Sequence, residues 1–113
     1  METMANKLFN KEAMDEVKEE GFGLFRLRLK GISTPVFIRF YRVHDSTRVH
    51  FVQSHFIKTP DLAEPHRSND PFGSDELDAA FRARSVLMIH YLPAMKTSTP
   101  NDSWLVKNDA FMW

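Results

Sequence analysis

The stretch of sequence that decides the fold is residues 24–58, LFRLRLKGISTPVFIRFYRVHDSTRVHFVQSHFIK. Apolar and polar side chains alternate along residues 24–30, which is the pattern of a strand with one face on the core. Residues 36–44 are apolar on both faces, as expected for a strand with neighbours on both sides, and residues 48–58 form a third candidate strand. Because short polar turns separate the three segments, the sequence predicts an antiparallel meander.

A first helix is predicted just before the meander, over residues 11–20. Asn10 is a favourable N-cap, and Gly21 suits the left-handed conformation of the residue that follows a helix. The apolar stripe of this segment is thin, so we expect one face of the helix to lie on the sheet and the other to face water. We expect residues 1–6, which precede it, to be disordered.

A second helix is predicted over residues 75–91. Ser74 is a favourable cap, acidic residues occupy the first turn, and apolar residues recur at helical spacing until Pro93. The run 85–92 has the length of a fourth strand, and that alternative stays open. A single helix is favoured because no turn residue interrupts the pattern. A further short strand is expected over residues 104–107.

Length and composition narrow the class of protein. The chain has 113 residues, 42% hydrophobic and 27% charged, which predicts one soluble globular domain over residues 1–113. It has no cysteine, which excludes disulfides, thiolate metal sites and thiol nucleophiles and fits a cytoplasmic location. No apolar run reaches the length of a membrane span. The expected fold class is α+β: a three- to four-stranded antiparallel sheet packed against two helices, in the order αβββα(β).

Charge is unevenly distributed along the chain. Residues 22–58 hold seven of the fifteen Lys and Arg side chains but only one of the fifteen Asp and Glu side chains, so a net charge of zero hides a basic segment. Strand alternation places Arg39 and Arg42 on opposite faces of the second strand. One of these two arginines must therefore enter the helix-covered side, where it pairs with an acid or lines a pocket. The candidate contacts to an acidic partner or an anion are Arg26, Arg28, Arg42 and Arg48.

Three functions are compatible with this pattern. The first is a non-catalytic binding module whose basic, aromatic sheet face, or the long loop over residues 59–73, contacts an acidic partner. The second is a small-molecule-binding protein or an enzyme with its pocket between the sheet and that loop. The third is binding of RNA or single-stranded DNA on the sheet face, which a net charge of zero disfavours. The candidate ligand contacts in the second case are Arg39, Tyr41, His55, His66 and Arg67.

Nothing in the sequence proposes a catalytic or metal site. The five histidines are scattered without the spacing of metal ligands, and no cofactor is implied. Ser54 and His55 are adjacent, but neighbouring strand residues point to opposite faces, so we expect no hydrogen-bonded catalytic pair. The sequence therefore favours binding over catalysis.

Apolar residues beyond those that one small core can bury indicate self-association. The second half of the second predicted helix is apolar nearly all round, and residues 111–113 add apolar area at a terminus. A second copy of the chain across a twofold axis is the most economical cover. The candidate residues of this homodimer interface are Val86, Ile89, Phe111 and Trp113.

Overall fold

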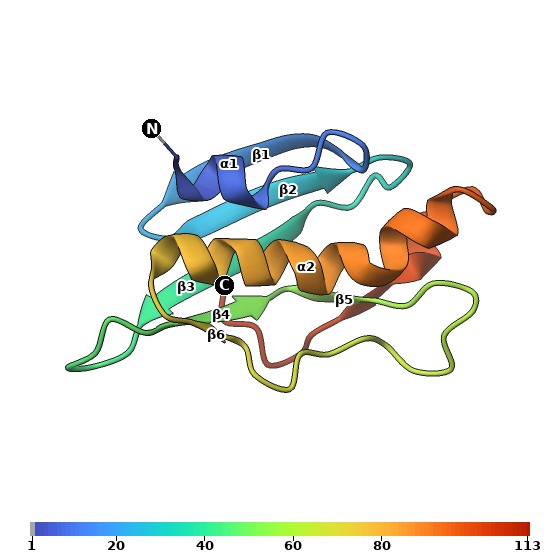
Figure 1. Cartoon of the computed structure of the whole chain (residues 1–113). Helices are drawn as coiled ribbons and strands as arrows, with labels where there is room; N and C mark the ends of the chain where they lie inside the picture. The colour runs from blue at the N-terminus through green and yellow to red at the C-terminus, as the bar shows by residue number, and fades with distance from the viewer. Residues whose placement is uncertain (1) are drawn as a thin grey trace.

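The computed structural model describes residues 2–113, and its architecture is drawn in Figure 1. The helices and strands are α1 (Met4–Leu8), β1 (Met14–Gly21), β2 (Leu24–Leu29), β3 (Val36–Arg42), β4 (Val49–Gln53), β5 (His55–Ile57), β6 (Phe72–Gly73), α2 (Glu76–Met95), the 3-10 turn η1 (Asp102–Trp104) and β7 (Leu105–Lys107). Five strands form one antiparallel sheet in the order β1-β2-β3-β4-β6, and β5 and β7 form a second, two-stranded sheet. The predicted α+β class with an antiparallel sheet is confirmed, although the strands are more numerous than the sequence indicated.

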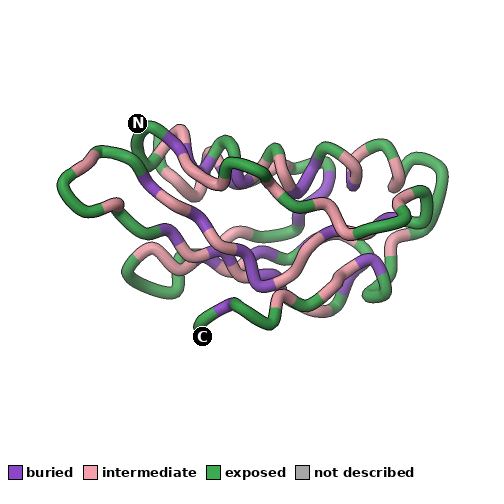
Figure 2. Tube along the Cα trace, turned by 90° about the horizontal axis from the view of Figure 1, so that it is seen from below, coloured by how far each residue is buried: buried purple, intermediate pink, exposed green. Residues whose placement is uncertain are grey.

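The two helices lie on one face of the five-stranded sheet, and the chain ends on the other side (Figure 1 and Figure 2). We call the helix-covered face the inner face and the opposite one the outer face. Along β2 and β3 the inner side chains are buried and the outer ones are only partly so, which is the period-two pattern that predicted these strands. The core between the layers is formed mainly by Phe25, Leu27, Leu29, Val36, Ile38, Phe40, Val49 and Phe51 of the sheet and by Ala80, Ala83, Leu87 and Tyr91 of α2.

The helix α2 follows its prediction closely. Its N-cap is Asp75 rather than the predicted Ser74, and the side chain of Asp75 accepts a hydrogen bond from the backbone N–H of Asp78. The helix continues through the run 85–92, so the alternative of a fourth strand there is wrong. It also passes Pro93, where the sequence predicted the end. A proline this close to the C-terminus of the helix removes one backbone hydrogen bond while its fixed φ still fits the helix. Within residues 2–113, no helix combines the length and the apolar composition needed to cross a membrane.

The predicted helix over residues 11–20 is wrong, because most of this segment forms β1. The side chain of Asn10, expected to cap the helix, instead accepts a hydrogen bond from the N–H of Glu12 in a tight turn. β1 then pairs with β2 along its whole length, and Arg26 of β2 forms ion pairs with two glutamates of β1. Pairing with the neighbouring strand therefore outweighs the helical preference of a segment rich in Glu and Lys.

Three residues, Gly21, Phe22 and Gly23, turn the chain from β1 into β2. Phe22 and Gly23 have φ angles of 42° and 77°, the left-handed conformation that a two-residue hairpin turn requires. A Cβ atom at residue 23 would lie 2.9 Å from the carbonyl oxygen of Phe40, so only glycine fits there. The side chain of Phe22 is fully exposed. Gly21, which the sequence pattern placed at the end of a helix, thus lies at the end of β1 in a β-hairpin.

A short helix precedes β1. The side chain of Thr3 accepts a hydrogen bond from the N–H of Asn6 at the start of α1, and Leu8 at its end is fully buried. α1 packs against α2 (Figure 1). The expectation of disorder over residues 1–6 did not anticipate this helix; residue 1 lies outside the described residues.

Ser54 divides the third predicted strand into β4 and β5. Its N–H donates to the carbonyl of Phe37 at 2.7 Å, while its hydroxyl accepts a hydrogen bond from the N–H of Phe37 at 2.8 Å. The carbonyl of Ser54 accepts a hydrogen bond of 2.8 Å from the N–H of Asn108. Because a side chain here takes the place of a backbone partner, the chain leaves the five-stranded sheet and β5 pairs with β7.

Asp102 attaches the C-terminal segment to the turn between β2 and β3. Its carboxylate accepts hydrogen bonds from the backbone N–H and the hydroxyl groups of both Ser33 and Thr34, at 2.5 to 3.1 Å. These bonds, that from the Thr34 hydroxyl above all, lower the pKa of Asp102 to about 2. The segment from η1 onward is therefore anchored at both the turn and the break at Ser54.

Tyr91 joins the helix layer to the sheet. Its side chain is fully buried, and its hydroxyl donates a hydrogen bond of 2.5 Å to the carbonyl oxygen of Lys30, next to the end of β2. Its ring packs edge-on against Trp104, with 5.5 Å between ring centroids. Burial, with a smaller contribution from Asp15, raises the pKa of Tyr91 to about 12, so the hydroxyl stays protonated and able to donate.

Replacing Tyr91 with phenylalanine is expected to lower the free energy of unfolding by about 1–2 kcal/mol, because the partly buried carbonyl of Lys30 loses its partner. Urea unfolding followed by circular dichroism measures the change. Tyr41→Phe is the matched control, since Tyr41 is the other tyrosine of the chain and is 40% exposed. The control should change stability by less than about 0.5 kcal/mol. Equal effects of the two substitutions would contradict the role assigned to Tyr91.

Candidate binding surface

The outer face of the sheet is covered by neither helix of the described residues (Figure 1 and Figure 2). Arg39 of β3 lies on it opposite Val52 of β4. Tyr41 follows on the same face opposite His50, whose ring stacks on Phe72 of β6 with 4.7 Å between centroids. A cationic side chain therefore stands among apolar and aromatic side chains, a combination typical of protein-binding surfaces.

Of the four arginines predicted to contact a partner or an anion, only Arg28 has no ion pair within residues 2–113. Arg39 on the outer face has none either. Arg28 and Arg39 therefore keep positive charges that no carboxylate of this chain neutralises directly. The other three arginines pair with acids: Arg26 with Glu16 and Glu20, Arg42 with Glu76, and Arg48 with Asp70 at the longer distance of 4.0 Å.

A hollow of about 250 Å³ lies between β4 and the loop over residues 59–73, and Val52, which lies opposite Arg39, is one of the residues that line it. The guanidinium of Arg67 lies over the ring of Phe56, 4.2 Å from its centroid, at the wall of the hollow. The side-chain amide of Asn108 donates to the carbonyl of Gln53 and is thereby fixed in place. The hollow is lined by His50, Phe51, Val52, Gln53, Phe56, Arg67, Ser68, Pro71 and Asn108.

The five predicted ligand contacts do not all gather in one place. Arg39 and Tyr41 share the outer face, and Arg67 lines the hollow next to them. His55 and His66 do not line this hollow. Of the five predicted residues, only Arg67 therefore lines the hollow between the sheet and the loop, while Arg39 and Tyr41 lie opposite two residues of β4 that do.

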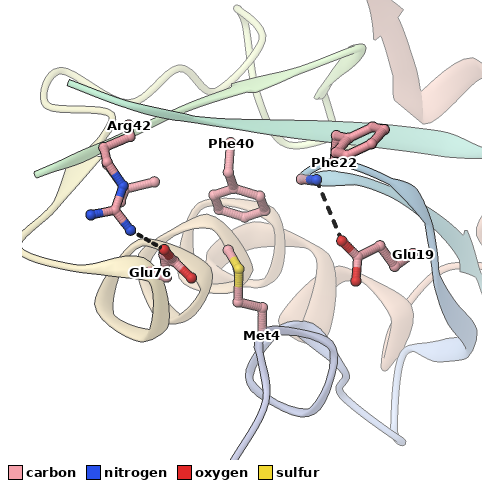
Figure 3. A pocket seen from close by; sticks show the side chains of 8 residues that line it. Met4, Glu19, Phe22, Phe40, Arg42 and Glu76 are labelled. Carbon is pink, nitrogen blue, oxygen red and sulfur yellow. Dashed lines mark hydrogen bonds and ion pairs between the residues drawn. The ribbon is translucent and has the colours of Figure 1, made fainter. Parts of the chain in front are cut away.

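Of Arg39 and Arg42, the sequence predicted that one must lie on the helix-covered side, where it pairs with an acid or lines a pocket. That residue is Arg42, which lies on the inner side of the sheet. Its Nη2 lies 2.5 Å from Oε1 of Glu76 at the start of α2. Figure 3 shows this pair at one end of a pocket of about 220 Å³, with Met4 in the middle and Glu19 at the other end. Glu19 and Glu76 outnumber Arg42 in this pocket, so it has no excess positive charge to attract an anion. The outer face of the sheet is therefore the better candidate for binding an acidic partner.

The prediction that Ser54 and His55 cannot form a hydrogen bond is wrong. The hydroxyl of Ser54 lies 2.8 Å from Nδ1 of His55, because strand alternation is interrupted at Ser54. Ser54 has no exposed surface, and its hydroxyl already accepts a hydrogen bond from Phe37, so a substrate does not reach it. Burial, and to a lesser extent Lys107, lowers the pKa of His55 and keeps the imidazole neutral. The hydrogen bond between Ser54 and His55 therefore belongs to the structure of the break between β4 and β5, not to a catalytic site.

Of the nine residues that line the hollow, only Arg67 was among the predicted ligand contacts. His50, Val52 and Asn108 are among those that sequence reasoning missed. Alternation along the third predicted strand places His50 and Val52 on one face, so a usable signal was present. No sequence signal indicated Asn108, because β7 brings it to the hollow by pairing with β5.

Comparison of the chain with models of protein families, with curated proteins and with solved structures found no match. The candidate surface therefore rests on its own geometry and charge.

The loop over residues 59–73 contacts α2 through His66, whose ring packs on that of His90 in the helix. The rings of His66 and His90 meet edge to face with 4.7 Å between centroids, and the N–H of His66 donates to the carbonyl of Ile57 at 2.8 Å. Burial, and then the nearby His90, lowers the pKa of His66 below its ordinary value of 6.5. Within residues 2–113, no group of three or more His, Cys, Asp or Glu side chains is arranged to hold a metal ion.

Acidification is expected to loosen this attachment of the loop. Because the pKa of His66 is lower in the folded than in the unfolded chain, the stability that its neutral form contributes is present above pH 6.5 and is lost as the pH falls below that value. Amide hydrogen exchange over residues 59–73, corrected for its intrinsic pH dependence, should therefore become faster between about pH 7.5 and about pH 5.

His66→Gln tests the assignment, because it should remove most of this pH dependence. His44→Gln is the control, since His44 lies in an exposed turn and should leave the loop unaffected. An unchanged pH dependence in His66→Gln would show that another group controls the loop.

Proposed function

We propose that the chain is a non-catalytic, homodimeric binding module whose outer sheet face binds an acidic segment of another protein. The observation that carries this proposal is that Arg39 forms no ion pair within residues 2–113 and lies on a sheet face that neither helix covers. Arg28 forms none within the same residues either, although it lies opposite Glu16 in the pairing of β1 with β2. A charge on an open, partly apolar face is available to a partner, whereas a charge already paired contributes little.

The residues around Arg39 supply the contacts that such a partner needs. A guanidinium donates two parallel hydrogen bonds to a carboxylate, which orients as well as attracts it. Tyr41 and Val52 on the same face offer apolar area that a bound segment can cover. Arg67, at the wall of the hollow beside Val52, is placed for a second acidic group.

A protein segment fits this surface better than a nucleic acid. The chain has no net charge, and Arg26 on the same face is paired with two glutamates of β1. A nucleic acid presents a phosphate at every nucleotide and would meet those glutamates as well as the arginines. A segment with a few separated carboxylates avoids this repulsion.

The hollow lined by Val52 and Arg67 favours a small anion as the second candidate function. Arg67, Ser68 and Asn108 converge on it with polar groups, and Val52 and Phe56 supply apolar walls. Binding of citrate at a fixed ionic strength, followed by the chemical shifts of the Asn108 side chain, separates this candidate from a surface that takes only peptides.

Charge reversal at Arg39 is expected to weaken binding of an acidic peptide. The probe is a fluorescent peptide of alternating Glu and Leu, titrated by anisotropy at low and at moderate salt. Arg39→Glu should raise the dissociation constant roughly tenfold or more, because it removes a bidentate contact and adds repulsion. Added salt should weaken binding of the original chain more than that of the variant.

Lys11→Glu is the matched control, because it makes the same change of charge at an exposed position in the turn before β1. It should change the dissociation constant by less than about twofold. Absence of peptide binding at low salt would refute the proposal. Tighter binding of an oligouridylate than of the peptide would replace the acidic protein segment with a nucleic acid.

A further inference from the structure

The side of α2 that faces away from the sheet carries an apolar stripe. Phe81 is 45% exposed and Ile89 is 58% exposed, and both lie on the helix face opposite its buried alanines. Leu77 and Leu92 are partly exposed and continue the stripe at helical spacing toward the two ends of α2. An exposed apolar stripe along a whole helix is typical of a surface covered by a partner.

The stripe is symmetric about Ser85. Phe81 precedes Ser85 by four residues and Ile89 follows it by four, so each lies about 6 Å from it along the helix axis. A hollow of about 400 Å³ adjoins the second half of the stripe, lined by Ser85, Met88, Ile89, Leu92 and Pro93. A partly exposed aromatic ring, with the guanidinium of Arg84 over it, and a shallow open hollow thus stand on either side of a small side chain.

We propose that a second copy of the chain packs its α2 antiparallel against this α2, with the twofold axis passing beside Ser85. Rotation about that axis brings residue 81 of each copy to residue 89 of the other. Phe81 of each copy then packs over the shallow apolar surface beside Ile89 of the other, and the small Ser85 lets the two helices approach closely. This inference rests on the proposed function, of which the homodimer is a part.

The charges of α2 favour the antiparallel arrangement. Asp75 and Asp78 stand at the start of the helix, and Lys96 follows its end. In the antiparallel pair the acidic end of each helix lies beside Lys96 of the other copy, and the negative C-terminal end of each helix dipole lies beside the positive N-terminal end of the other. A parallel pair would place Asp75 and Asp78 next to the same acids of the other copy.

The interface proposed here differs from the one predicted from the sequence, because three of the four predicted residues do not lie on the stripe. Val86 packs against the core and Phe111 is buried within the chain, while Trp113 packs edge-on against Phe37 on the outer face. Of the four predicted interface residues, only Ile89 lies on the stripe. A dimer through Trp113 would cover part of the outer face, whereas a dimer through α2 leaves both outer faces free.

The mass of the full chain in solution tests the interface. Sedimentation equilibrium over a dilution series should give a dimer, and Ile89→Asp should raise its dissociation constant about 100-fold, because the substitution places two charges in one apolar interface. Phe22→Asp is the control, since Phe22 is a fully exposed aromatic in the hairpin between β1 and β2, outside the stripe, and aspartate tolerates its left-handed backbone. A monomer at every concentration, or equal weakening by both substitutions, overturns the proposal.

Cross-linking locates the axis without any disruptive substitution. The chain has no cysteine, so Ser85→Cys introduces the only thiol, and mild oxidation should link most of the protein into disulfide dimers. Thr47→Cys, in the exposed turn between β3 and β4, should not link. A dimer in which Ser85→Cys links no better than Thr47→Cys uses another surface and refutes the inference.

The peptide titration separates this inference from the proposed function. Monomeric Ile89→Asp is expected to bind the acidic peptide at its own outer face. A chain that binds the peptide but is monomeric overturns the dimer alone, whereas a dimer that binds no acidic peptide overturns the proposed binding alone.

Discussion

The position of α2 on the sheet depends on the buried side chain of Tyr91, which packs in the core and donates a hydrogen bond from its hydroxyl to the carbonyl of Lys30. This bond fixes the second half of α2 at the end of β2, and the ring of Tyr91 also holds Trp104 of the C-terminal segment. Once α2 is fixed in this way, its alanines and Leu87 face the sheet. The opposite side of the helix and the outer face of the sheet are consequently left as two exposed surfaces, which is the property on which both proposals rest.

Strong periodicity made much of the fold predictable. β2 and β3 were found because burial on one face imposes alternation, and α2 was found because its apolar residues recur at helical spacing over five turns. The segment over residues 11–20 failed for a physical reason. Asn10 and Gly21 are good helix ends locally, but the pairing of Arg26 with the glutamates of β1 is a tertiary interaction that no local pattern reveals.

The candidate surface was predictable only in part. Strand alternation correctly separated Arg39 from Arg42, because that depends on residue parity alone. The break at Ser54 was not predictable, since it depends on hydrogen bonds from Phe37 and Asn108, which lie far away in the sequence. The sequence predicted a pocket between the sheet and the loop, but it did not predict most of the residues that line the hollow found there, Asn108 among them.

The anchoring of the C-terminal segment has a consequence for the order of folding. Asp102 binds residues that precede it by 68 and 69 positions, and Asn108 binds Gln53, 55 positions earlier. Contacts of such long sequence separation close large loops and form late. A nascent chain that has emerged only as far as α2 therefore lacks β7, and its β2–β3 turn and the break at Ser54 lack the partners that Asp102 and Asn108 supply. Folding of this domain on the ribosome then requires that the segment around residues 102–108 has left the exit tunnel.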